Sequence, residues 1–491
     1  MKLKKIGLVL GVLVMSTSLN SQTSNVKVDN GPILVQDRKW FKREIAGEAE
    51  KQIYFLNKGT DLSQMECVNS KTLQVDYKVN INIPNQYLVA PDGVYGFDNN
   101  HLYYRKGKLV YLGENFEKKK FQQVVGQTFD PQTGAEIIKP LKLCDEEVIK
   151  KKPKTIRFIE STDSSQIMIL KYFSDENKFT FLVVDFNLDI VNRGELELPS
   201  GTDLYTLKYN SDGTIYFLTE LKDAEKKIKY YNKFFIQNIK KNNQKSYELT
   251  VGSNFVSHIN YKINSEKIVM AGVCKSSNND KGSVFFASLD NKTPKFNIQP
   301  KVIASELSYN GITENNYFSI NNIILKENGG AYVILEEKGR LTTGTNNFGN
   351  VHTNTNNTLT DRSRSYEVAG SILVFNYDEN DNFKWEKKIE KSLILYYSHE
   401  VDQIDFYSNI FNNDLVFLYN LRGADSRGRM LNLTMTKINE QGDYSSSKII
   451  EYPKEEPFIF TSACASKIKA KSLISFQRQK QNYKFIKLSL K

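Results

Sequence analysis

Short apolar runs recur along this chain about every fifty residues, and this spacing constrains the fold more than any other feature. The runs favour Ile, Val, Tyr and Phe and are too short for most helices, which predicts strands covered on both faces. Six clear runs lie at residues 164–170, 212–218, 265–271, 329–335, 413–419 and 470–476, and two earlier candidates lie at 51–56 and 92–97. The midpoints Ile167, Ile215 and Ile268 are 48 and 53 residues apart.

A second pattern lies between these runs: a strand, a polar turn and then an alternating strand. It occurs at residues 181–198, 234–250, 284–299, 372–389 and 433–450. In the fourth of these segments, Phe383, Trp385 and Ile389 fall on one face, while charged residues at 384, 386 and 388 fall on the other. This period of two is expected of a half-covered outer strand.

The spacing predicts an all-β fold. Blades of a β-propeller have four strands and about 40 to 50 residues, and a blade buries its faces only by stacking against its neighbours around a central axis. With 40% hydrophobic residues the chain can build a large core. We predict one propeller domain over residues 22–491, with about seven blades and a range of six to eight. The stretch 113–154 has a charged, irregular pattern that obscures the early count.

The first 21 residues have the pattern of a secretory signal peptide. Lys2, Lys4 and Lys5 precede a short apolar core at residues 6–15, and cleavage before Gln22 fits the small and polar residues that follow. The core is too short to span a bilayer, and no other stretch could. The first cysteine is Cys67, so we expect no lipid anchor near the cut. We predict a monomer that is secreted, periplasmic or on the cell surface, without a transmembrane segment.

The net charge of +11 comes from lysines that are interspersed with acids. The densest basic and aromatic stretch is residues 226–241, and nucleic-acid binders mix such residues. A strand with lysines on its solvated face and aromatics on its buried face explains the same pattern. For an exported protein we expect the strand, and no nucleic-acid partner.

The segment "DENDN" places oxygen-bearing side chains at Asp378, Asn380 and Asn382, as calcium loops do. An EF-hand loop needs Gly at its sixth place and Glu at its twelfth, where this chain has Phe383 and Ile389. Asp and Asn also suit tight turns because their side chains bond to the nearby backbone. We therefore predict a hairpin turn here and no metal site.

The four cysteines are Cys67, Cys144, Cys274 and Cys464, and no two form a C-x-x-C pair. Export would permit disulfides, and four cysteines allow three pairings. Cys274 and Cys464 lie in strand-like runs, where buried thiols and bridges are both plausible.

Motifs for enzyme chemistry are missing from the sequence. It has no H-E-x-x-H, G-x-S-x-G or G-x-G-x-x-G, and Gly339 and Gly344 have phosphate-loop spacing without the lysine that should follow. The four histidines are far apart: His101, His258, His352 and His399. We expect no cofactor.

A polar insertion at residues 339–365 interrupts one blade. It is rich in Asn and Thr, and a loop this long is uncommon unless it is functional or disordered. We expect it to project from one rim of the ring, either as a solvated loop or as a binding surface that includes residues 342–360. The candidate binding residues are Glu336, Glu337, Arg340, Asn346, Asn347, Phe348 and His352. The simplest interpretation of Glu336 and Glu337 is a solvated pair.

The segments "GGAYVILEEKGR", "GSILVFNYDENDNFKWEKKIEKS" and "NNDLVFLYN", with the Thr- and Arg-bearing insertion between the first two, resemble a group of exported proteins of Bacteroidetes-type bacteria that have no assigned activity. The resemblance covers about residues 321–420. The chain departs from the group at Asn382, where the hairpin usually has Gly. The resemblance implies export and a propeller-like fold, and it implies no activity.

Two functions fit this sequence. The first is a non-enzymatic propeller whose rim loops bind a cell-envelope or extracellular protein, peptide or glycan, which includes a purely structural surface role as a weaker variant. The second is a carbohydrate-active hydrolase or lyase that uses two carboxyl groups about 5 to 10 Å apart at the propeller channel. The candidate carboxylates are Asp185, Glu220, Glu336, Glu337 and Asp378. We favour the first function because no nucleophile or metal motif is present.

Overall fold

The structure is a computed structural model of the whole chain. It describes residues 26–35, 40–59, 63–82, 100–117, 121–147, 155–172, 178–200, 202–223, 228–241, 243–249, 254–263, 267–276, 282–290, 299–302, 317–343, 364–391, 393–394, 406–422, 430–454, 458–461, 465–469, 472–479 and 482–490. The predicted signal peptide, residues 1–21, lies outside the described residues. Within them, no helix is long and apolar enough to cross a membrane.

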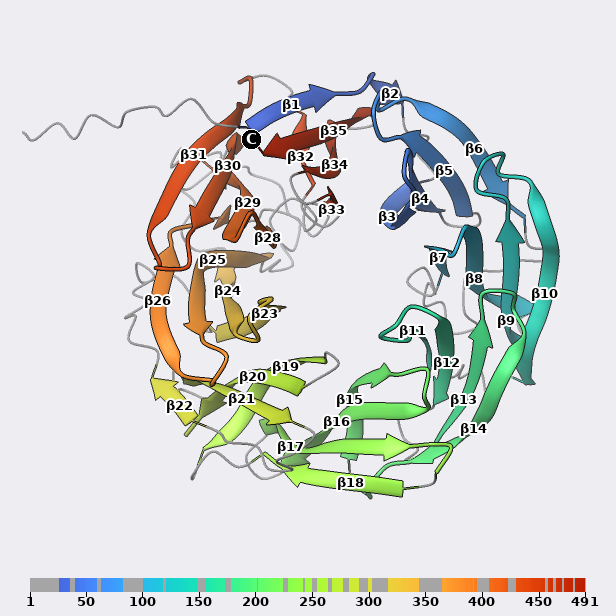
Figure 1. Cartoon of the computed structure of the whole chain (residues 1–491), viewed down its shortest axis with the longest axis horizontal. Coiled ribbons are helices and arrows are strands. Elements are labelled where there is room, and N and C mark those ends of the chain that lie inside the picture. Colours follow the sequence, from blue (N-terminus) through green and yellow to red (C-terminus); the bar gives the residue numbers. More distant parts are fainter. Residues whose placement is uncertain are drawn as a thin grey trace, which may run out of the picture.

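The described strands form a ring of four-stranded antiparallel meanders around a central axis (Figure 1). Hydrogen bonding groups them into seven sheets. One sheet has eight strands and consists of two meanders joined through the single pair Tyr231↔Val256. The described residues therefore form eight blades, and the predicted all-β propeller is confirmed at the upper end of its predicted range.

In each blade the first strand lies nearest the axis and the fourth lies outside (Figure 1). Blade one contains β3 (Trp40–Glu48), β4 (Gln52–Gly59), β5 (Ser63–Asn69) and β6 (Val75–Ile81). Blade two contains β7 (Asn100–Arg105), β8 (Lys108–Glu117), β9 (Phe121–Phe129) and β10 (Glu136–Glu147). Blade three contains β11 (Thr155–Glu160), β12 (Gln166–Tyr172), β13 (Lys178–Asp185) and β14 (Ile190–Glu197). Blade four contains β15 (Thr202–Tyr209), β16 (Thr214–Asp223), β17 (Ile228–Asn238) and β18 (Asn243–Glu248).

The second half of the ring repeats this order. Blade five contains β19 (Phe255–Ile263), β20 (Lys267–Lys275), β21 (Ser283–Asp290) and β22 (Gln299–Val302). Blade six contains β23 (Tyr317–Leu325), β24 (Ala331–Thr343), β25 (Arg364–Tyr377) and β26 (Phe383–Ile389), with β27 (Leu393–Ile394) paired to β25. Blade seven contains β28 (Tyr407–Phe411), β29 (Asp414–Arg422), β30 (Met430–Ile438) and β31 (Tyr444–Glu451). Blade eight contains β32 (Ile459–Phe460), β33 (Ser466–Lys469), β34 (Ser472–Gln479) and β35 (Asn482–Leu490), completed by β1 (Val26–Asn30) and β2 (Leu34–Val35).

The apolar runs of the sequence are the second strands of the blades. β12, β20 and β24 are buried along most of their length, as expected for strands covered on both faces. The candidate run at 92–97 lies outside the described residues, and the second strand of blade two is β8. The stretch 113–154, whose charged and irregular sequence obscured the early blade count, contains β9 and β10. β9 is hard to recognise as a strand in the sequence, because its buried residues include the polar Gln122, Gln123 and Gln127.

Four of the five predicted hairpins, at 181–198, 234–250, 372–389 and 433–450, are confirmed, and each joins the third strand of a blade to the fourth. For the fifth, at 284–299, β21 pairs with a fourth strand that begins at Gln299, and the turn at 291–298 lies outside the described residues. The turn at Asp378 shows how side chains hold such a hairpin. Its Oδ1 accepts backbone N–H bonds from Asn380 at 3.0 Å and Asn382 at 2.8 Å, and Asp381 has a positive φ of 65°. The predicted turn is therefore held by the acid and amide side chains that resemble a calcium loop.

The hydrophobic core lies between neighbouring blades. One cluster combines Val269 and Ala271 of blade five with Val333 and Phe375 of blade six. Across the same seam, the rings of Phe286 and Tyr377 stack with centroids 4.2 Å apart. Each blade thus buries its faces only against the next one, as the repeat requires.

No disulfide joins Cys67, Cys144 and Cys274 to one another. Cys67 and Cys274 are buried in β5 and β20, so Cys274 occupies the predicted strand position. Cys464 lies outside the described residues.

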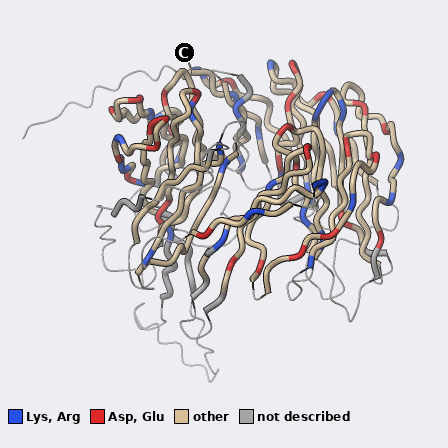
Figure 2. The backbone as a smooth tube through the Cα atoms, turned by 60° about the horizontal axis from the view of Figure 1, so that its bottom comes forward, with Lys and Arg blue, Asp and Glu red and all other residues tan. Residues whose placement is uncertain are grey.

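The first strand of the chain closes the ring. β1 pairs antiparallel with β35, from Val26↔Leu490 to Asn30↔Ile486, and Val26 and Val28 pack against the core of blade eight. Nothing in the sequence indicated the pairing of β1 with β35, because β1 is short and half-exposed. Lys and Arg residues are interspersed with Asp and Glu residues around the ring (Figure 2).

We expect a chain that begins at residue 31 to be less stable than one that begins at residue 26. Removing β1 exposes an edge of β35 and the surface under two valines, which should lower the free energy of unfolding by about 2–4 kcal/mol. Urea unfolding followed by circular dichroism measures the change. Lys27→Ala in the longer chain is the control, since Lys27 is exposed, and should change stability by less than about 0.5 kcal/mol. Equal stability of the two chains would contradict closure by β1.

Candidate functional site at the loop end of the ring

The two ends of the ring differ in how their strands are connected. Because the blades are antiparallel meanders, connections from second to third strands and from one blade to the next share one end, here called the loop end. The other, turn end carries the hairpins between first and second strands and between third and fourth strands. The longest connections, residues 82–99, 303–316, 344–363 and 395–406, all begin and end at the loop end.

The predicted insertion belongs to the loop end of blade six. Pairing of β24 with β25 continues to Thr343↔Arg364, so residues 339–343 and 364–365 are strand rather than insertion. The predicted boundary was therefore too wide, and the β-branched Thr residues at its start favour the strand instead. Arg340 pairs with Glu367 in this ladder, and its side chain is outside the described part. Asn346, Asn347, Phe348 and His352 also lie outside the described residues.

A register shift in the ladder positions Glu337. Glu336 pairs with Ile372, but Lys338 pairs with Ala369, so Gly370 and Ser371 together face Glu337. This is the two-against-one arrangement of a β-bulge, which can redirect a side chain. The carboxylate of Glu337 lies 3.4 Å from the backbone N of Ser371. A Cβ at position 370 would overlap Glu337 Oε2, so the glycine makes room for the carboxylate.

Glu336 forms a buried ion pair on the other side of the sheet. Its Oε1 lies 2.7 Å from Nζ of Lys391, and both side chains are fully buried. Lys338 Nζ lies 3.5 Å from Oε2. Lys391 follows β26 and also lies 5.1 Å from the ring centre of Phe406. The pair therefore connects the second strand of blade six to the end of its fourth strand, directly below the insertion.

The prediction of a solvated glutamate pair was wrong. Glu336 is 0% exposed and Glu337 is 3% exposed, and the two carboxylates point to opposite faces of β24. Burial raises the pKa of Glu337, and the nearby carboxylate of Glu390 raises it further, against the opposing effects of Ser371 and Lys388. Both side chains therefore hold the buried base of the insertion and do not form part of an exposed binding surface.

Buried polar residues also occupy the loop end of other second strands. We call this set the polar layer: Asn57, Lys58, Glu114, Asn115, Thr219, Lys275, Glu336, Glu337, Asn420 and Gln477. Two of these residues, Glu336 and Glu337, were among the predicted site residues. A signal for the others was available, because each follows the apolar part of a second strand, as in "IYFLNK", "LVYLGEN" and "LVFLYN".

The most connected part of this end lies at the seam between blades one and eight. Glu66, fully buried, lies 2.8 Å from Arg43 and 3.1 Å from Lys78, and accepts a 2.7 Å hydrogen bond from Tyr483 of β35. The guanidinium carbon of Arg43 lies 3.8 Å from the centre of the Tyr483 ring. Burial works to raise the pKa of Glu66, but Arg43 and Lys78 hold it below the usual value. The contacts between blades one and eight therefore stabilise the ionised form of Glu66.

A second buried contact joins blades seven and eight. Asn420 donates a 2.8 Å hydrogen bond to the carbonyl of Phe460 and accepts one at 2.6 Å from Tyr452. The hydroxyl of Tyr452 also accepts the backbone N–H of Phe460 at 3.1 Å. This arrangement holds the inner strand of blade eight against blade seven.

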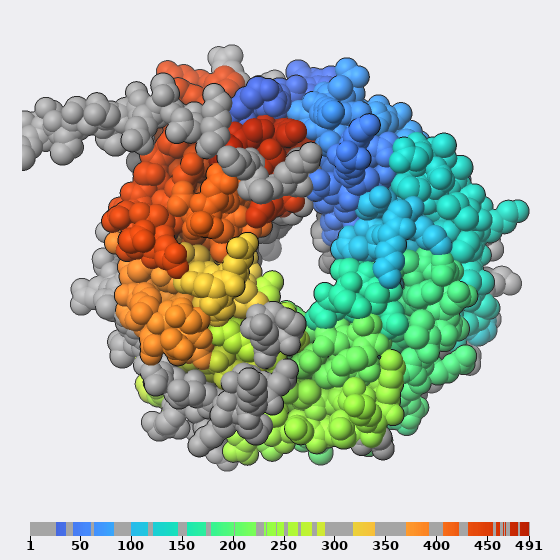
Figure 3. All heavy atoms as spheres, viewed as in Figure 1, coloured from blue at the N-terminus to red at the C-terminus, as the bar shows by residue number. Residues whose placement is uncertain are grey.

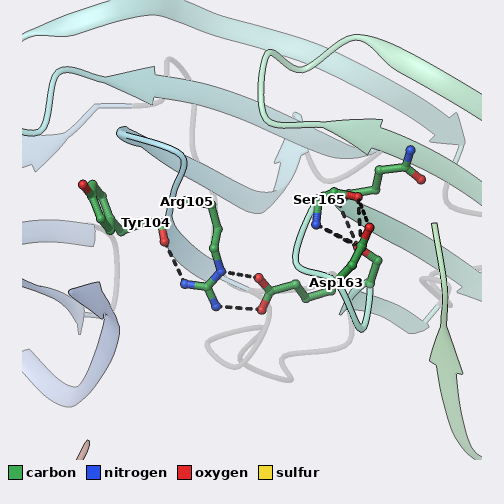
Figure 4. Close-up of polar contacts among 7 residues, drawn as sticks. Tyr104, Arg105, Asp163 and Ser165 are labelled. Carbon is green, nitrogen blue, oxygen red and sulfur yellow. Dashed lines mark hydrogen bonds and ion pairs between the residues drawn. The ribbon is translucent and has the colours of Figure 1, made fainter. Parts of the chain in front are cut away.

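Charged contacts at the turn end also join blades. Arg105, at the end of β7, binds both carboxylate oxygens of Glu160, at the end of β11, at 2.6 and 3.0 Å (Figure 4). Its third nitrogen donates to the carbonyl of Tyr104 at 2.7 Å (Figure 4). Such a two-pronged pair is strong and directional, and here it links blades two and three.

Asp163 organises the adjacent turn. It accepts hydroxyl hydrogen bonds from Ser161 at 2.7 Å, Ser165 at 2.8 Å and Ser211 at 2.6 Å. The contact between Asp163 and Ser165 is drawn in Figure 4. Partial desolvation raises its pKa, but these bonds outweigh that effect and hold the pKa at about 2. The Asp163 carboxylate therefore has a structural role in holding the turn.

The structure does not gather the five candidate carboxylates into one site. Asp185 and Asp378 accept backbone N–H bonds within their own turns, at the turn end of blades three and six. Glu220 lies on β16 of blade four, and Glu336 and Glu337 lie at the loop end of blade six. The ring is hollow at its centre (Figure 3), but these residues belong to different blades and ends. Among the described residues, no three His, Cys, Asp or Glu side chains lie close enough to hold a metal ion.

Neither family models nor curated protein sequences match this chain. Solved structures do. The WD40 domain of SCAP from fission yeast aligns over 95% of this chain and 98% of its own, at 8% identity and a TM-score of 0.45. The Dos1 propeller aligns over 94% of both chains, at 9% identity and a TM-score of 0.46. A protein from Lactobacillus plantarum aligns over 86% of this chain and 98% of its own, at 10% identity and a TM-score of 0.39. The chain resembles WD40 and bacterial propeller proteins in fold, and these likenesses carry no argument about function.

We expect Lys391→Met to lower the free energy of unfolding by about 3–5 kcal/mol, because it leaves the buried Glu336 without its principal cation. Lys388→Met is the matched control in the same blade. Lys388 pairs with Glu390, which is 78% exposed, so its loss should cost less than about 1 kcal/mol. Urea unfolding measures both. Similar losses in the two variants would contradict the proposed importance of the buried pair.

The raised pKa of Glu337 predicts a pH-dependent contribution to stability. The folded state binds this proton more tightly than the unfolded state, so the contribution is present at low pH and is lost as pH rises above about 4.5. The stability of Glu337→Gln relative to the parent should therefore increase between pH 4 and pH 7 in urea unfolding. Glu451→Gln is the control with opposite sign, because Lys448 lowers the pKa of Glu451. A relative stability of Glu337→Gln that stays constant with pH would contradict the shift.

Proposed function

We propose that this protein is an exported, non-enzymatic binding protein. Its loop end would recognise a cell-envelope or extracellular partner, which is a protein, peptide or glycan. The observation that carries the proposal is the difference between the two ends of the ring. All four of the longest connections start from one end, whereas tight hydrogen-bonded turns form most of the other.

Long connections on a rigid scaffold are the usual place for binding residues. Here the scaffold below them is fixed by buried charges. The Glu336–Lys391 pair and the bulge at Glu337 hold the two strands from which the insertion starts. A fixed base reduces the conformational entropy that the loop must lose when it binds. Amide and hydroxyl groups in the insertion, with Phe348 and His352, would supply the contacts.

Two sequence features support an extracellular partner. The first 21 residues have the pattern of a signal peptide, and residues 321–420 resemble exported proteins of Bacteroidetes-type bacteria. The described structure adds a closed ring with charges of both signs interspersed (Figure 2). A mixed surface of this kind gives no single-sign field for a nucleic acid.

A carbohydrate-active enzyme is the second candidate, and one observation favours it. Ser371 contacts two carboxylates, that of Glu337 through its N–H and that of Glu390 through its hydroxyl at 3.1 Å. Glu337 is buried with a raised pKa, as the general acid of glycoside cleavage is, and Glu390 is exposed. Glu337 is almost inaccessible, however, so we place binding first. Glucose-releasing or lyase activity on polysaccharides that disappears in both Glu337→Gln and Glu390→Gln would reverse this order.

We expect the insertion to bind without contributing to the core. Residues 344–363 are replaced by Asn-Gly, which keeps the Thr343↔Arg364 pair and closes the hairpin. The melting temperature should change by less than about 2 °C, because the sequence of this segment has no core-forming apolar run. Capture of partners from an envelope extract of the source organism, quantified by mass spectrometry, should fall at least tenfold for one or more components.

Glu379→Ala is the control for this experiment, because Glu379 is exposed at the turn end of the same blade. It should capture the same components as the parent. A large loss of stability in the Asn-Gly variant would show that the insertion packs as part of the core. Unchanged capture would show that the partner binds elsewhere.

A further inference from the structure

A cavity of about 400 Å³ opens between blades six and seven at the turn end, away from the proposed binding surface. Its described lining comes from the end of β23 and the turn that follows, the start of β24, the inner strand β28, the turn after β30, and β33 of blade eight. The volume lies in the range of small-molecule sites, about 300 to 1,000 Å³. No residue of the polar layer lines it.

The charged groups of this cavity balance one another. Lys326 lies 3.0 Å from the amide oxygen of Asn376 and 3.5 Å from the carboxylate of Glu440. Lys467 is exposed and donates one hydrogen bond of 2.8 Å to the carbonyl of Ile410, which leaves two further donors on its ammonium. Glu327 and Glu440 are exposed. Two lysines and two glutamates give the lining no net formal charge.

The cavity also combines amide and apolar groups. Asn328, Asn409 and Asn413 line it together with Ile324 and Ile410. Asn409 is held in place, because its amide nitrogen donates to the hydroxyl of Tyr407 at 3.1 Å and its oxygen accepts the N–H of Ile410 at 2.8 Å. Planar amides and carboxylates can each bind two neighbouring hydroxyls, and aliphatic side chains can cover a C–H face.

We propose that this cavity binds a neutral saccharide of one or two rings. Such a ligand presents hydroxyl donors and acceptors at its edge and C–H groups on its faces, which matches the mixture of Glu, Lys, Asn and Ile in the lining. A simple anion or cation would meet an unfavourable charge for each favourable one. The proposed contacts are hydroxyl groups to the carboxylate of Glu327 and the ammonium of Lys467, with Ile410 against the ring.

The test is saturation-transfer difference NMR and calorimetry on the full-length mature chain. The probes are glucose, galactose, N-acetylglucosamine and cellobiose, with glycine, which is a zwitterion, and inorganic phosphate, which is an anion, as charged comparisons. We expect at least one sugar to bind with millimolar or better affinity, and neither charged probe to bind as well. The double variant Glu327→Gln/Lys467→Met should weaken that binding at least about tenfold, because it removes two charge-assisted hydrogen bonds.

Ile410→Trp is a second variant, which fills the cavity and should abolish binding, with circular dichroism to verify its fold. The matched control is Glu195→Gln/Lys178→Met, which removes an exposed ion pair of blade three and should bind as the parent does. No binding of any sugar overturns the proposal. Equal binding by the double variant places the site elsewhere and overturns it, and stronger binding of glycine or phosphate overturns the ligand class.

Discussion

The seam between the last blade and the first is the contact on which the ring depends. A blade cannot bury its two faces alone, so the row of blades is stable only when the last face meets the first. Two separate sets of contacts join the last blade to the first in this structure. β1 completes blade eight by pairing with β35, and Tyr483 of β35 reaches Glu66 in blade one, where Arg43 and Lys78 also converge. Backbone pairing and a buried charge network therefore close the same joint.

Burying Glu66 and Glu336 carries a large desolvation cost, which ion pairs in a low-dielectric interior only partly offset. Apolar residues could fill the same positions with no such cost. What the charges add is a requirement for one arrangement, since Glu66 gains its hydrogen bond from Tyr483 only when blade eight is docked, and Glu336 gains its 2.7 Å ion pair only when Lys391 follows β26 correctly. The polar layer thus specifies how the loop end is assembled, in addition to any contribution to stability.

The sequence predicted the features that depend on local pattern. Period-two alternation and Asn- or Asp-rich turns located the outer hairpins, and the runs around Ile167, Ile215 and Ile268 located second strands. The predictions from sequence failed where polar or charged residues are buried. The glutamines of β9 concealed a strand, and Glu336 and Glu337 suggested solvent although Lys391 and Gly370, more than thirty residues away, accommodate them. The pairing of β1 with β35 joins opposite ends of the chain, and no local pattern can indicate such a contact.

The two ends of the ring also differ in what they can change without losing the fold. At the turn end, Asp163 and Asp378 use their carboxylates to close turns, so substitutions there act on the hairpins themselves. At the loop end, the polar layer lies inside the strands, and the connections begin only beyond it. Their length and composition can therefore vary while the seam, the bulge at Glu337 and the Glu336–Lys391 pair stay intact. A surface that can vary independently of its support suits recognition by loops, and in the described part of the ring the loop end has this property.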